Sequence, residues 1–248
     1  MKLEYLSRYL LIQIIGLTVA VGLLVFGFLR IVSGTKMTAT QRNQSTAGNA
    51  VQVGGKETIT VGFALTEGAT MIDFAGPWEV FQDAGGGTGP RRFRLFTVGD
   101  SRDPIRTSGG MTVVPEYAFD DAPVPQIVVV PAQQGGPKLA EWLQKAKKNS
   151  AIVMSVCTGA FELGNAGLLD GKQATTHHEF YEAFQKSFPK TTLVKGRRYV
   201  QTDSTTYTSG GLTSDIDLAL HIVDKLCGPG VAVKTAEYME YQGKGWLE

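Results

Sequence analysis

Short apolar runs without any charge alternate with helical patterns through most of this 248-residue chain. The runs at residues 58–65, 126–131 and 151–156 are typical of strands that are buried on both faces of a parallel sheet. Helical spacing of apolar residues occurs at 76–84, 138–148, 158–169 and 213–226. This alternation predicts an α/β fold in which helices sandwich a mostly parallel sheet.

A second feature is the charge-free segment at residues 10–29, LLIQIIGLTVAVGLLVFGFL. A helix of this length would cover about the 30 Å of a bilayer core. We therefore expect one uncleaved transmembrane helix within an N-terminal anchor, residues 1–32. A cleaved signal peptide and a buried core helix are the alternatives. Basic residues flank the segment equally, but the short basic tail ahead of it favours a soluble domain outside the cytoplasm. The expected localisation is a single-pass membrane protein.

Residues 33–56 are rich in Ser, Thr, Gly, Asn and Gln, which predicts a flexible linker. Residues 57–248 then form the α/β domain. The 24 basic and 23 acidic side chains nearly cancel, which argues against a broad basic surface for nucleic acid. The two cysteines, Cys157 and Cys227, fit neither a disulfide framework nor a zinc pattern. Two independent thiols and a single bridge between them both remain open.

Cys157 stands between an apolar strand and a helix, in S-V-C-T-G-A. The small residues Gly159 and Ala160 allow a sharp turn that would lift a nucleophile clear of the sheet. At a helix N-terminus, free backbone N–H groups favour an anion, so we expect a lowered thiol pKa and an available thiolate. The same N–H groups could hold charge that develops on a substrate. The alternative is a structural cysteine that happens to follow a buried strand.

Possible proton-handling partners lie at other strand ends. Asp73, in M-I-D-F-A-G-P-W-E, follows the first strand and could exchange a proton across the site, or could cap a helix that begins near Gly76. Glu79 has at most a supporting role inside that helix. His177 follows an apparent strand and could reach the thiolate, although a surface or core histidine is more common.

Three segments together resemble the ThiJ/PfpI superfamily, whose fold is that of class I glutamine amidotransferases (flavodoxin-like). They are E-G-A-T-M-I-D-F-A-G-P-W-E-V-F, S-V-C-T-G-A-F-E-L-G-N-A-G-L-L-D-G-K-Q-A-T-T-H and T-S-G-G-L-T-S-D-I-D-L-A-L-H-I-V. The likeness covers residues 57–228. Within the superfamily the segments look most like isonitrile hydratases and the ligand-binding domains of AraC-type regulators.

The resemblance implies roles for single residues. Cys157 falls on the family's nucleophile, Asp73 on the acidic residue that contacts it, and Thr158 on the residue that helps isonitrile hydratases to bind the reacting group. Threonine at 158 replaces the histidine of the protease-like members, which argues against a peptidase. The resemblance further implies a homodimer and hydration of an isonitrile to a formamide, with neither a metal nor an organic cofactor.

Three functions compete at this point. The first is an enzyme, a lyase or hydrolase that acts on a small electrophilic substrate through a cysteine adduct. The second is a non-catalytic ligand-binding module, although too few residues follow Cys227 for a helix-turn-helix region. The third is a thiol redox sensor, since an exposed low-pKa thiolate oxidises readily.

Overall fold

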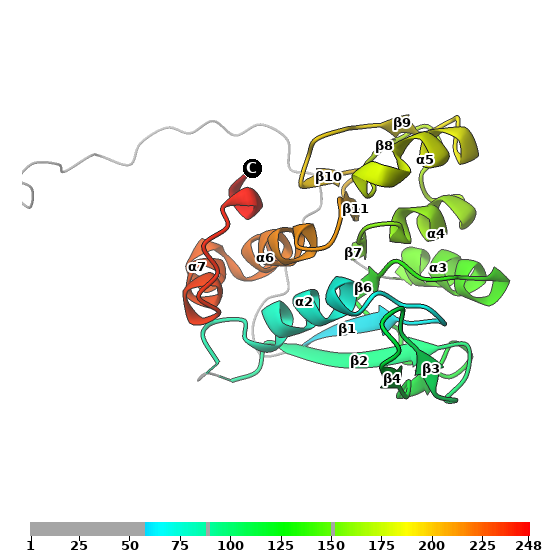
Figure 1. The fold of residues 1–248 in the computed structure, drawn as a ribbon. Coiled ribbons are helices and arrows are strands. Elements are labelled where there is room, and N and C mark those ends of the chain that lie inside the picture. The colour runs from blue at the N-terminus through cyan, green and yellow to red at the C-terminus, as the bar shows by residue number, and fades with distance from the viewer. Residues whose placement is uncertain (1–57, 88–89, 150–151) are drawn as a thin grey trace, which may run out of the picture. The chain divides into compact units, whose positions relative to one another are not determined.

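The computed structural model describes residues 58–87, 90–149 and 152–248 (Figure 1). Its main feature is a seven-stranded sheet in the order β10-β11-β7-β6-β1-β2-β5. All neighbouring strands are parallel except the β10–β11 pair. The mostly parallel sheet predicted from the alternating pattern is therefore confirmed. The strands are β1 (Ile59–Ala64), β2 (Phe93–Gly99), β5 (Tyr117–Ala118), β6 (Ile127–Val130), β7 (Ile152–Ser155), β10 (Tyr199–Gln201) and β11 (Thr206–Ser209).

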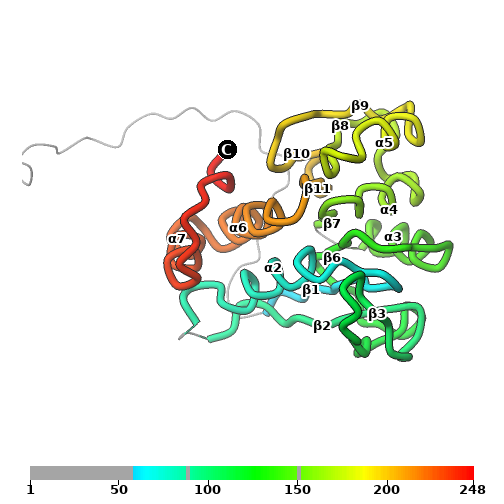
Figure 2. Tube along the Cα trace, in the orientation of Figure 1, coloured from blue at the N-terminus to red at the C-terminus, as the bar shows by residue number. Residues whose placement is uncertain are grey.

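Helices cover both faces of this sheet, and Figure 2 follows the chain through them. The helices are α2 (Met71–Gln82), α3 (Pro137–Asn149), α4 (Gly159–Asn165), α5 (Tyr181–Ser187), α6 (Ser214–Cys227) and α7 (Pro229–Tyr238). Two small two-stranded sheets join them: β3 (Ile105–Arg106) with β4 (Thr112–Val113), and β8 (Gln173–Ala174) with β9 (Thr192–Leu193). Two short 3-10 turns, His178–Phe180 and Gly245–Leu247, complete the described elements.

Two apolar cores hold the layers together. Alternate residues of the central strand β6 enter different cores: Ile127 and Val129 pack in one, Val128 and Val130 in the other. The first core contains side chains of α2, α6 and α7, and the second contains side chains of α3, α4 and α5. Burial on both faces explains why the central strands carry no charge at all.

Helix α2 differs from its expected boundaries. It begins at Met71, so Pro77 lies inside it and Asp73 lies in its first turn. Thr70 occupies the N-cap position. Asp73 is therefore not the cap of a helix that starts near Gly76. Its side chain points into the protein instead, which leaves it free for another role.

The membrane part of the expected fold needs correction. Within the described ranges no helix is both long and apolar enough to cross a bilayer. The longest, α6, has 14 residues where a span needs about 20. The segment at 10–29 and the linker at 33–56 lie outside the described residues. We therefore correct the fold class to the flavodoxin-like α/β sheet alone, and withdraw the transmembrane helix, the membrane partner and the single-pass, extracytoplasmic localisation.

Candidate active site around Cys157

Cys157 occupies a sharp turn between β7 and α4. Its φ angle is +56°, in the left-handed region that costs a non-glycine residue about 1 kcal/mol. Main-chain groups hold it there: its N–H donates to the carbonyl oxygen of Gly210 at 3.0 Å, and its carbonyl oxygen accepts from Oγ1 of Thr176 at 2.9 Å. A turn is therefore present where the sequence predicted a sharp one, at the end of a buried strand.

Gly159 makes the turn possible. A Cβ atom at this position would lie 2.2 Å from the carbonyl oxygen of Val130 and 2.8 Å from that of Pro131. Any side chain would collide with the backbone at the end of β6, so the first turn of α4 can pack against β6 only with glycine here. Gly159 thus positions the nucleophile without touching the sulfur.

Asp73 lies beside the thiol and is fully buried. Its Oδ2 accepts a hydrogen bond from the backbone N–H of Ala132 at 3.1 Å. Burial raises the pKa of Asp73 to about 7, although this bond and a hydrogen bond from the Cys157 thiol both act to lower it. Helix α2 and the end of β6 therefore present a carboxyl group that can bind or release a proton near neutral pH.

The Cys157 thiol is harder to ionise than the sequence suggested. Cys157 is only 7% exposed. Its burial is the largest cause, and the negative charge of Asp73 the second, that raise the pKa of the thiol to about 11. Hydrogen bonds from the backbone N–H groups of Thr158 and Leu212 and from the Thr158 hydroxyl lower the pKa, but by less. Helix α4 has only seven residues, so its dipole adds little. The expectation of a lowered thiol pKa was wrong because it ignored desolvation.

The two shifts have one chemical consequence. Because the pKa is about 7 for Asp73 and about 11 for the thiol, the carboxyl group ionises first as the pH rises. Above about pH 7 the pair is then a thiol beside a carboxylate. Such a pair suits general-base chemistry, in which the carboxylate takes the thiol proton as sulfur attacks an electrophile.

The other predicted residues lie at different distances from this centre. Thr158 is next to the sulfur through its N–H and hydroxyl. His177 is half-buried; its ring packs against Gly211 and stacks on that of His178 at 4.5 Å, while its Nδ1 accepts from the N–H of Glu179. Glu79 is on the exposed side of α2 and bonds to Gln82. The structure thus brings Cys157, Asp73, Thr158 and Gly159 together, and leaves Glu79 outside.

The sequence alone did not point to two residues of the site. Leu212, with a φ of +46°, contributes its N–H to the sulfur from the loop before α6. Asp215, in the first turn of α6, is fully buried close to Asp73. The only signal in the sequence was the pair of acidic residues Asp215 and Asp217, in S-D-I-D at a helix start. Two residues that are two positions apart in a helix cannot both face the same way.

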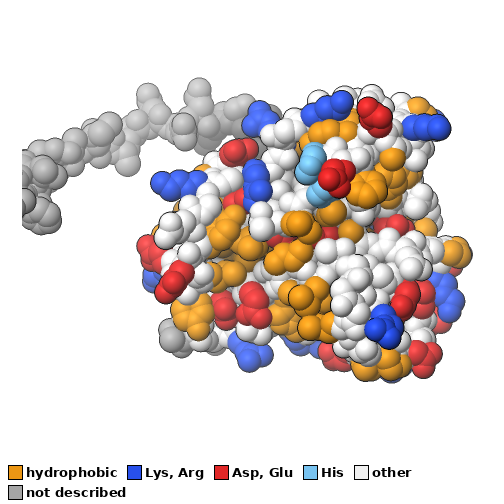
Figure 3. Space-filling view, viewed as in Figure 1, with side chains coloured by type: hydrophobic (Ala, Val, Ile, Leu, Met, Phe, Trp, Pro, Cys, Tyr) orange, Lys and Arg blue, Asp and Glu red, His pale blue; other side chains and the backbone are white. Residues whose placement is uncertain are grey.

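Four exposed apolar residues lie next to residues of the site in the chain or in space. Met71 and Ile72 precede Asp73, Leu212 donates to the sulfur, and the ring of Phe180 lies 5.9 Å from that of His177. All four residues with large apolar side chains are exposed. Figure 3 shows hydrophobic side chains next to the histidines on this face.

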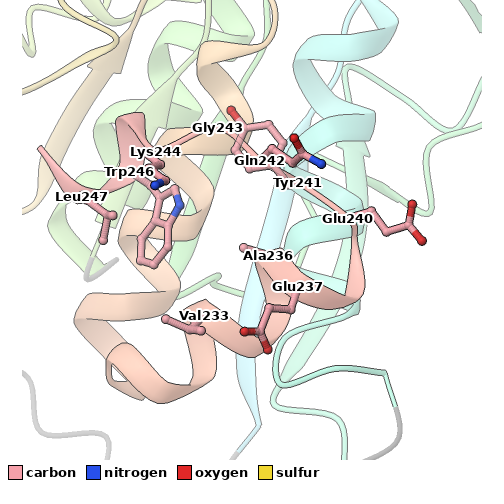
Figure 4. Close-up of a pocket in the computed structure, with 10 residues that line it drawn as sticks. All are labelled: Val233, Ala236, Glu237, Glu240, Tyr241, Gln242, Gly243, Lys244, Trp246 and Leu247. Carbon is pink, nitrogen blue, oxygen red and sulfur yellow. The ribbon is translucent and has the colours of Figure 1, made fainter. Parts of the chain in front are cut away.

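A cavity lies elsewhere, between α7 and the segment that follows it (Figure 4). Its volume is about 640 Å³, and its walls include Val233, Ala236, Tyr241 and Trp246. It contains neither cysteine nor Asp73, so we place the chemistry at Cys157. Among the residues that the structure describes, no group of His, Cys, Asp or Glu is arranged to hold a metal ion.

Known proteins resemble this chain in sequence. Isonitrile hydratase from Pseudomonas putida is 29% identical over 189 residues, covering 74% of this chain and 78% of that protein. The HTH-type transcriptional regulator CdhR from Pseudomonas aeruginosa is 31% identical over 150 residues, covering 58% of this chain and 44% of the regulator. The chain thus spans about half the length of the regulators that it matches.

Solved structures share the fold at lower identity. A ThiJ/PfpI family protein from Pseudomonas syringae superposes with a TM-score of 0.68 at 21% identity, over 83% of this chain and 84% of that one. Drosophila melanogaster DJ-1beta gives 0.64 at 16% identity, over 75% and 100%. The model of the DJ-1/PfpI family matches residues 59–225. With the strand order, the cysteine turn and these matches in agreement, the chain belongs to the DJ-1/PfpI family.

Proposed function

We propose that this protein is an enzyme that adds water to a small, uncharged electrophile through a covalent adduct on Cys157, with an isonitrile as the substrate. One observation carries the proposal: a buried thiol beside a buried carboxyl group, with the N–H groups of Thr158 and Leu212 directed at the sulfur. The similarity to an isonitrile hydratase supports the choice of substrate.

The reaction would begin with the transfer of the thiol proton from Cys157 to the carboxylate of Asp73. Sulfur attacks the terminal carbon of the isonitrile, and Asp73 returns the proton to that carbon, which gives a thioimidate. Water then adds to the same carbon, the carbon–sulfur bond breaks, and sulfur recovers a proton. The products are an N-substituted formamide and the free thiol, so one isonitrile consumes one water and Asp73 ends as it began.

The surroundings of the sulfur favour a narrow, uncharged substrate. Because Cys157 is only 7% exposed, a thin terminal group reaches it more readily than a branched carbonyl compound. Negative charge would meet Asp73 and Asp215 in a desolvated setting, so anionic substrates are disfavoured. The exposed apolar side chains near the site, Ile72, Leu212 and Phe180 among them, suit an apolar substituent on the substrate.

The test is turnover of a neutral alkyl isonitrile, with the formamide product followed by proton NMR. Cys157→Ser should lower the rate by about 10³-fold or more, since the hydroxyl is a far weaker nucleophile at this pH. Cys227→Ser is the matched control and should retain the wild-type rate, because Cys227 lies at the end of α6. Unchanged turnover in Cys157→Ser would rule out the adduct, and no turnover by the wild-type protein would rule out the substrate.

A second candidate is a ligand-binding module without catalysis, which the likeness to HTH-type regulators favours. In that case the same isonitrile or another small molecule would bind stoichiometrically without product. The raised thiol pKa argues against the third candidate, a redox sensor, because oxidation to sulfenic acid proceeds through the thiolate. A homodimer and the absence of a nucleic-acid partner both stay predictions.

A further inference from the structure

The loop of residues 210–213, which joins β11 to α6, supports the Cys157 turn at two points. The carbonyl oxygen of Gly210 accepts the N–H of Cys157 at 3.0 Å, and the N–H of Leu212 donates to the sulfur. Leu212 has a φ angle of +46°, which is unfavourable for leucine and persists only where surrounding contacts hold it. Any residue that fixes this loop therefore also fixes two contacts of the nucleophile.

Arg198, the residue before β10, holds both ends of the 210–213 loop. Its backbone carbonyl oxygen accepts the N–H of Gly210 at 2.9 Å, where the pairing of β10 with β11 ends. Its Nη2 donates to the carbonyl oxygen of Thr213 at 2.6 Å, and both Nη atoms lie 3.4 Å from the Thr213 hydroxyl oxygen. Thr213 occupies the N-cap position of α6 without a capping bond from its side chain, so the hydroxyl group accepts from Arg198 instead.

A buried carboxylate fixes the guanidinium group in turn. Asp217, in the first turn of α6, accepts from Nε of Arg198 at 2.6 Å and from the N–H of Trp246 at 3.1 Å. A Cβ atom at Gly245 would lie 2.7 Å from Oδ2 of Asp217, so the segment after α7 packs directly on this ion pair. Because Asp217 neutralises the arginine at short range, Arg198 acts on the Cys157 turn through its hydrogen bonds rather than through its charge.

This arrangement depends on the shape of an arginine side chain. One guanidinium group bridges a carbonyl oxygen at the start of α6 and a carboxylate in its first turn. The planar guanidinium presents its N–H donors in a rigid fork, whereas the ammonium group of lysine is a compact charge on a flexible stem. A lysine at position 198 could keep the ion pair with Asp217, but it could not hold the carbonyl group of Thr213 as well.

We propose that Arg198 is a positioning residue for Cys157: it fixes the 210–213 loop, and thereby keeps the carbonyl group of Gly210 and the N–H of Leu212 directed at the nucleophile. The inference rests on the proposed function for its catalytic meaning, whereas the order of the loop is a property of the resting protein. During the reaction the N–H of Leu212 would stabilise the negative charge that develops on sulfur as the thiol proton leaves for Asp73. No bond forms or breaks at Arg198.

The order of the loop can be measured without any substrate. Protein labelled with ¹⁵N at leucine is compared by NMR relaxation as the wild type, Arg198→Lys and the control Arg197→Lys. The Leu212 signal is assigned by its loss in Leu212→Met. The side chain of Arg197 is exposed and pairs with Glu248, so the control makes the same substitution at the preceding residue without altering the bonds to Thr213.

We expect the order parameter of the Leu212 amide to fall from about 0.85, typical of rigid backbone, to below about 0.6 in Arg198→Lys. Arg197→Lys should keep the wild-type value. If the Leu212 amide is as rigid in Arg198→Lys as in the wild type, the proposal is overturned. Should Arg198→Lys fail to fold, the double variant Arg198→Met with Asp217→Asn removes the bonds to Thr213 without leaving an unpaired buried charge, and gives the same readout.

Turnover then separates this proposal from the proposed function. With a neutral alkyl isonitrile, Arg198→Lys should lower kcat by about tenfold and leave KM within about twofold, because the N–H of Leu212 acts on charge that develops after the substrate has bound. A mobile Leu212 with unchanged kcat, or an equal loss of kcat in Arg197→Lys, would overturn the positioning role. Absence of turnover in the wild type, with Leu212 mobile only in Arg198→Lys, would reject the proposed function and keep the role of Arg198 in ordering the loop.

Discussion

When a thiol and a carboxyl group are buried side by side, a negative charge on one disfavours a negative charge on the other. In this protein the main-chain N–H groups of Thr158 and Leu212 favour charge on sulfur, while burial and the carboxylate of Asp73 oppose it. The opposing effects are larger, so sulfur keeps its proton at neutral pH. Under the proposed mechanism the thiolate would form only at the moment of attack, which would protect the thiol from oxidants that react with free thiolate.

The first residue-scale prediction concerns stability and pH. Since the pKa of Asp73 rises from 3.8 unfolded to about 7 folded, the native state binds more protons between these values, and stability falls as the pH rises through this window. In Asp73→Asn this part of the decline should vanish, on the order of 4 kcal/mol at about 1.4 kcal/mol per pKa unit. Urea unfolding at pH 4 and pH 8 checks it. An equally steep decline in the variant would contradict the burial of an ionisable Asp73.

The same variant should also lose catalysis. Asp73→Asn keeps an acceptor for the N–H of Ala132 but removes the base, so the rate should fall by about 10²- to 10⁴-fold. Steady-state turnover and the melting temperature are measured side by side. Loss of rate with stability retained supports the proton-transfer role, whereas parallel losses of both would indicate a structural role.

A second substitution tests the packing of the turn. Gly159→Ala places a methyl group against the carbonyl oxygens of Val130 and Pro131, and should destabilise the protein by about 1–3 kcal/mol. The matched control is Gly230→Ala in α7, where no heavy atom lies within 4 Å of the added carbon. Thermal unfolding should show a clear loss for the first and little change for the second; similar melting temperatures would mean that the turn can shift.

At the scale of elements, one carboxylate holds several segments together. Asp203, in the β10–β11 connection, bonds to Lys147 at the end of α3 at 3.2 Å and to Lys172 ahead of β8 at 2.7 Å. Lys147 also bonds to the hydroxyl groups of Thr205 and Thr206. These half-buried contacts join α3, the β10–β11 hairpin and the β8 segment.

Asp203→Asn should therefore destabilise the protein by about 1–3 kcal/mol, because two half-buried lysines lose their counter-charge. Asp170→Asn is the control, since its pair with Lys190 is exposed and exposed pairs contribute less than about 1 kcal/mol. Denaturant unfolding of both variants measures the two losses of stability. Equal losses would show that the Asp203 cluster is no stronger than a surface pair.

The helices and strands also show which parts of the fold could be predicted from the sequence. The strands β1, β6 and β7 were predictable because burial on both faces excludes charge from them, and the nearness of Cys157 to Asp73 followed from parallel strands that end at one edge. The start of α2 was misplaced because Pro77 was assigned to the first turn. The direction of the thiol pKa and the inward side chain of Asp215 depend on burial by distant segments, which no local pattern reports.

At the scale of the whole molecule, the members of both cores among the described residues lie between Ile59 and Trp246. We therefore expect residues 57–248 to fold without the preceding segment, as the proposed domain boundary requires. A chain that begins at residue 57 should unfold in one transition at the melting temperature of the full chain, as measured by circular dichroism. A markedly lower temperature would show that the boundary is drawn too late.

The backbone of Cys157 is held by hydrogen bonds to the carbonyl oxygen of Gly210 and from the hydroxyl group of Thr176, and Gly159 packs against the carbonyl oxygens of Val130 and Pro131. None of these contacts involves Ile72 or Phe180, which are both exposed. If the proposed function holds, libraries that vary Ile72 and Phe180 should change the range of accepted compounds while leaving the nucleophile undisturbed, which makes this scaffold a starting point for directed evolution.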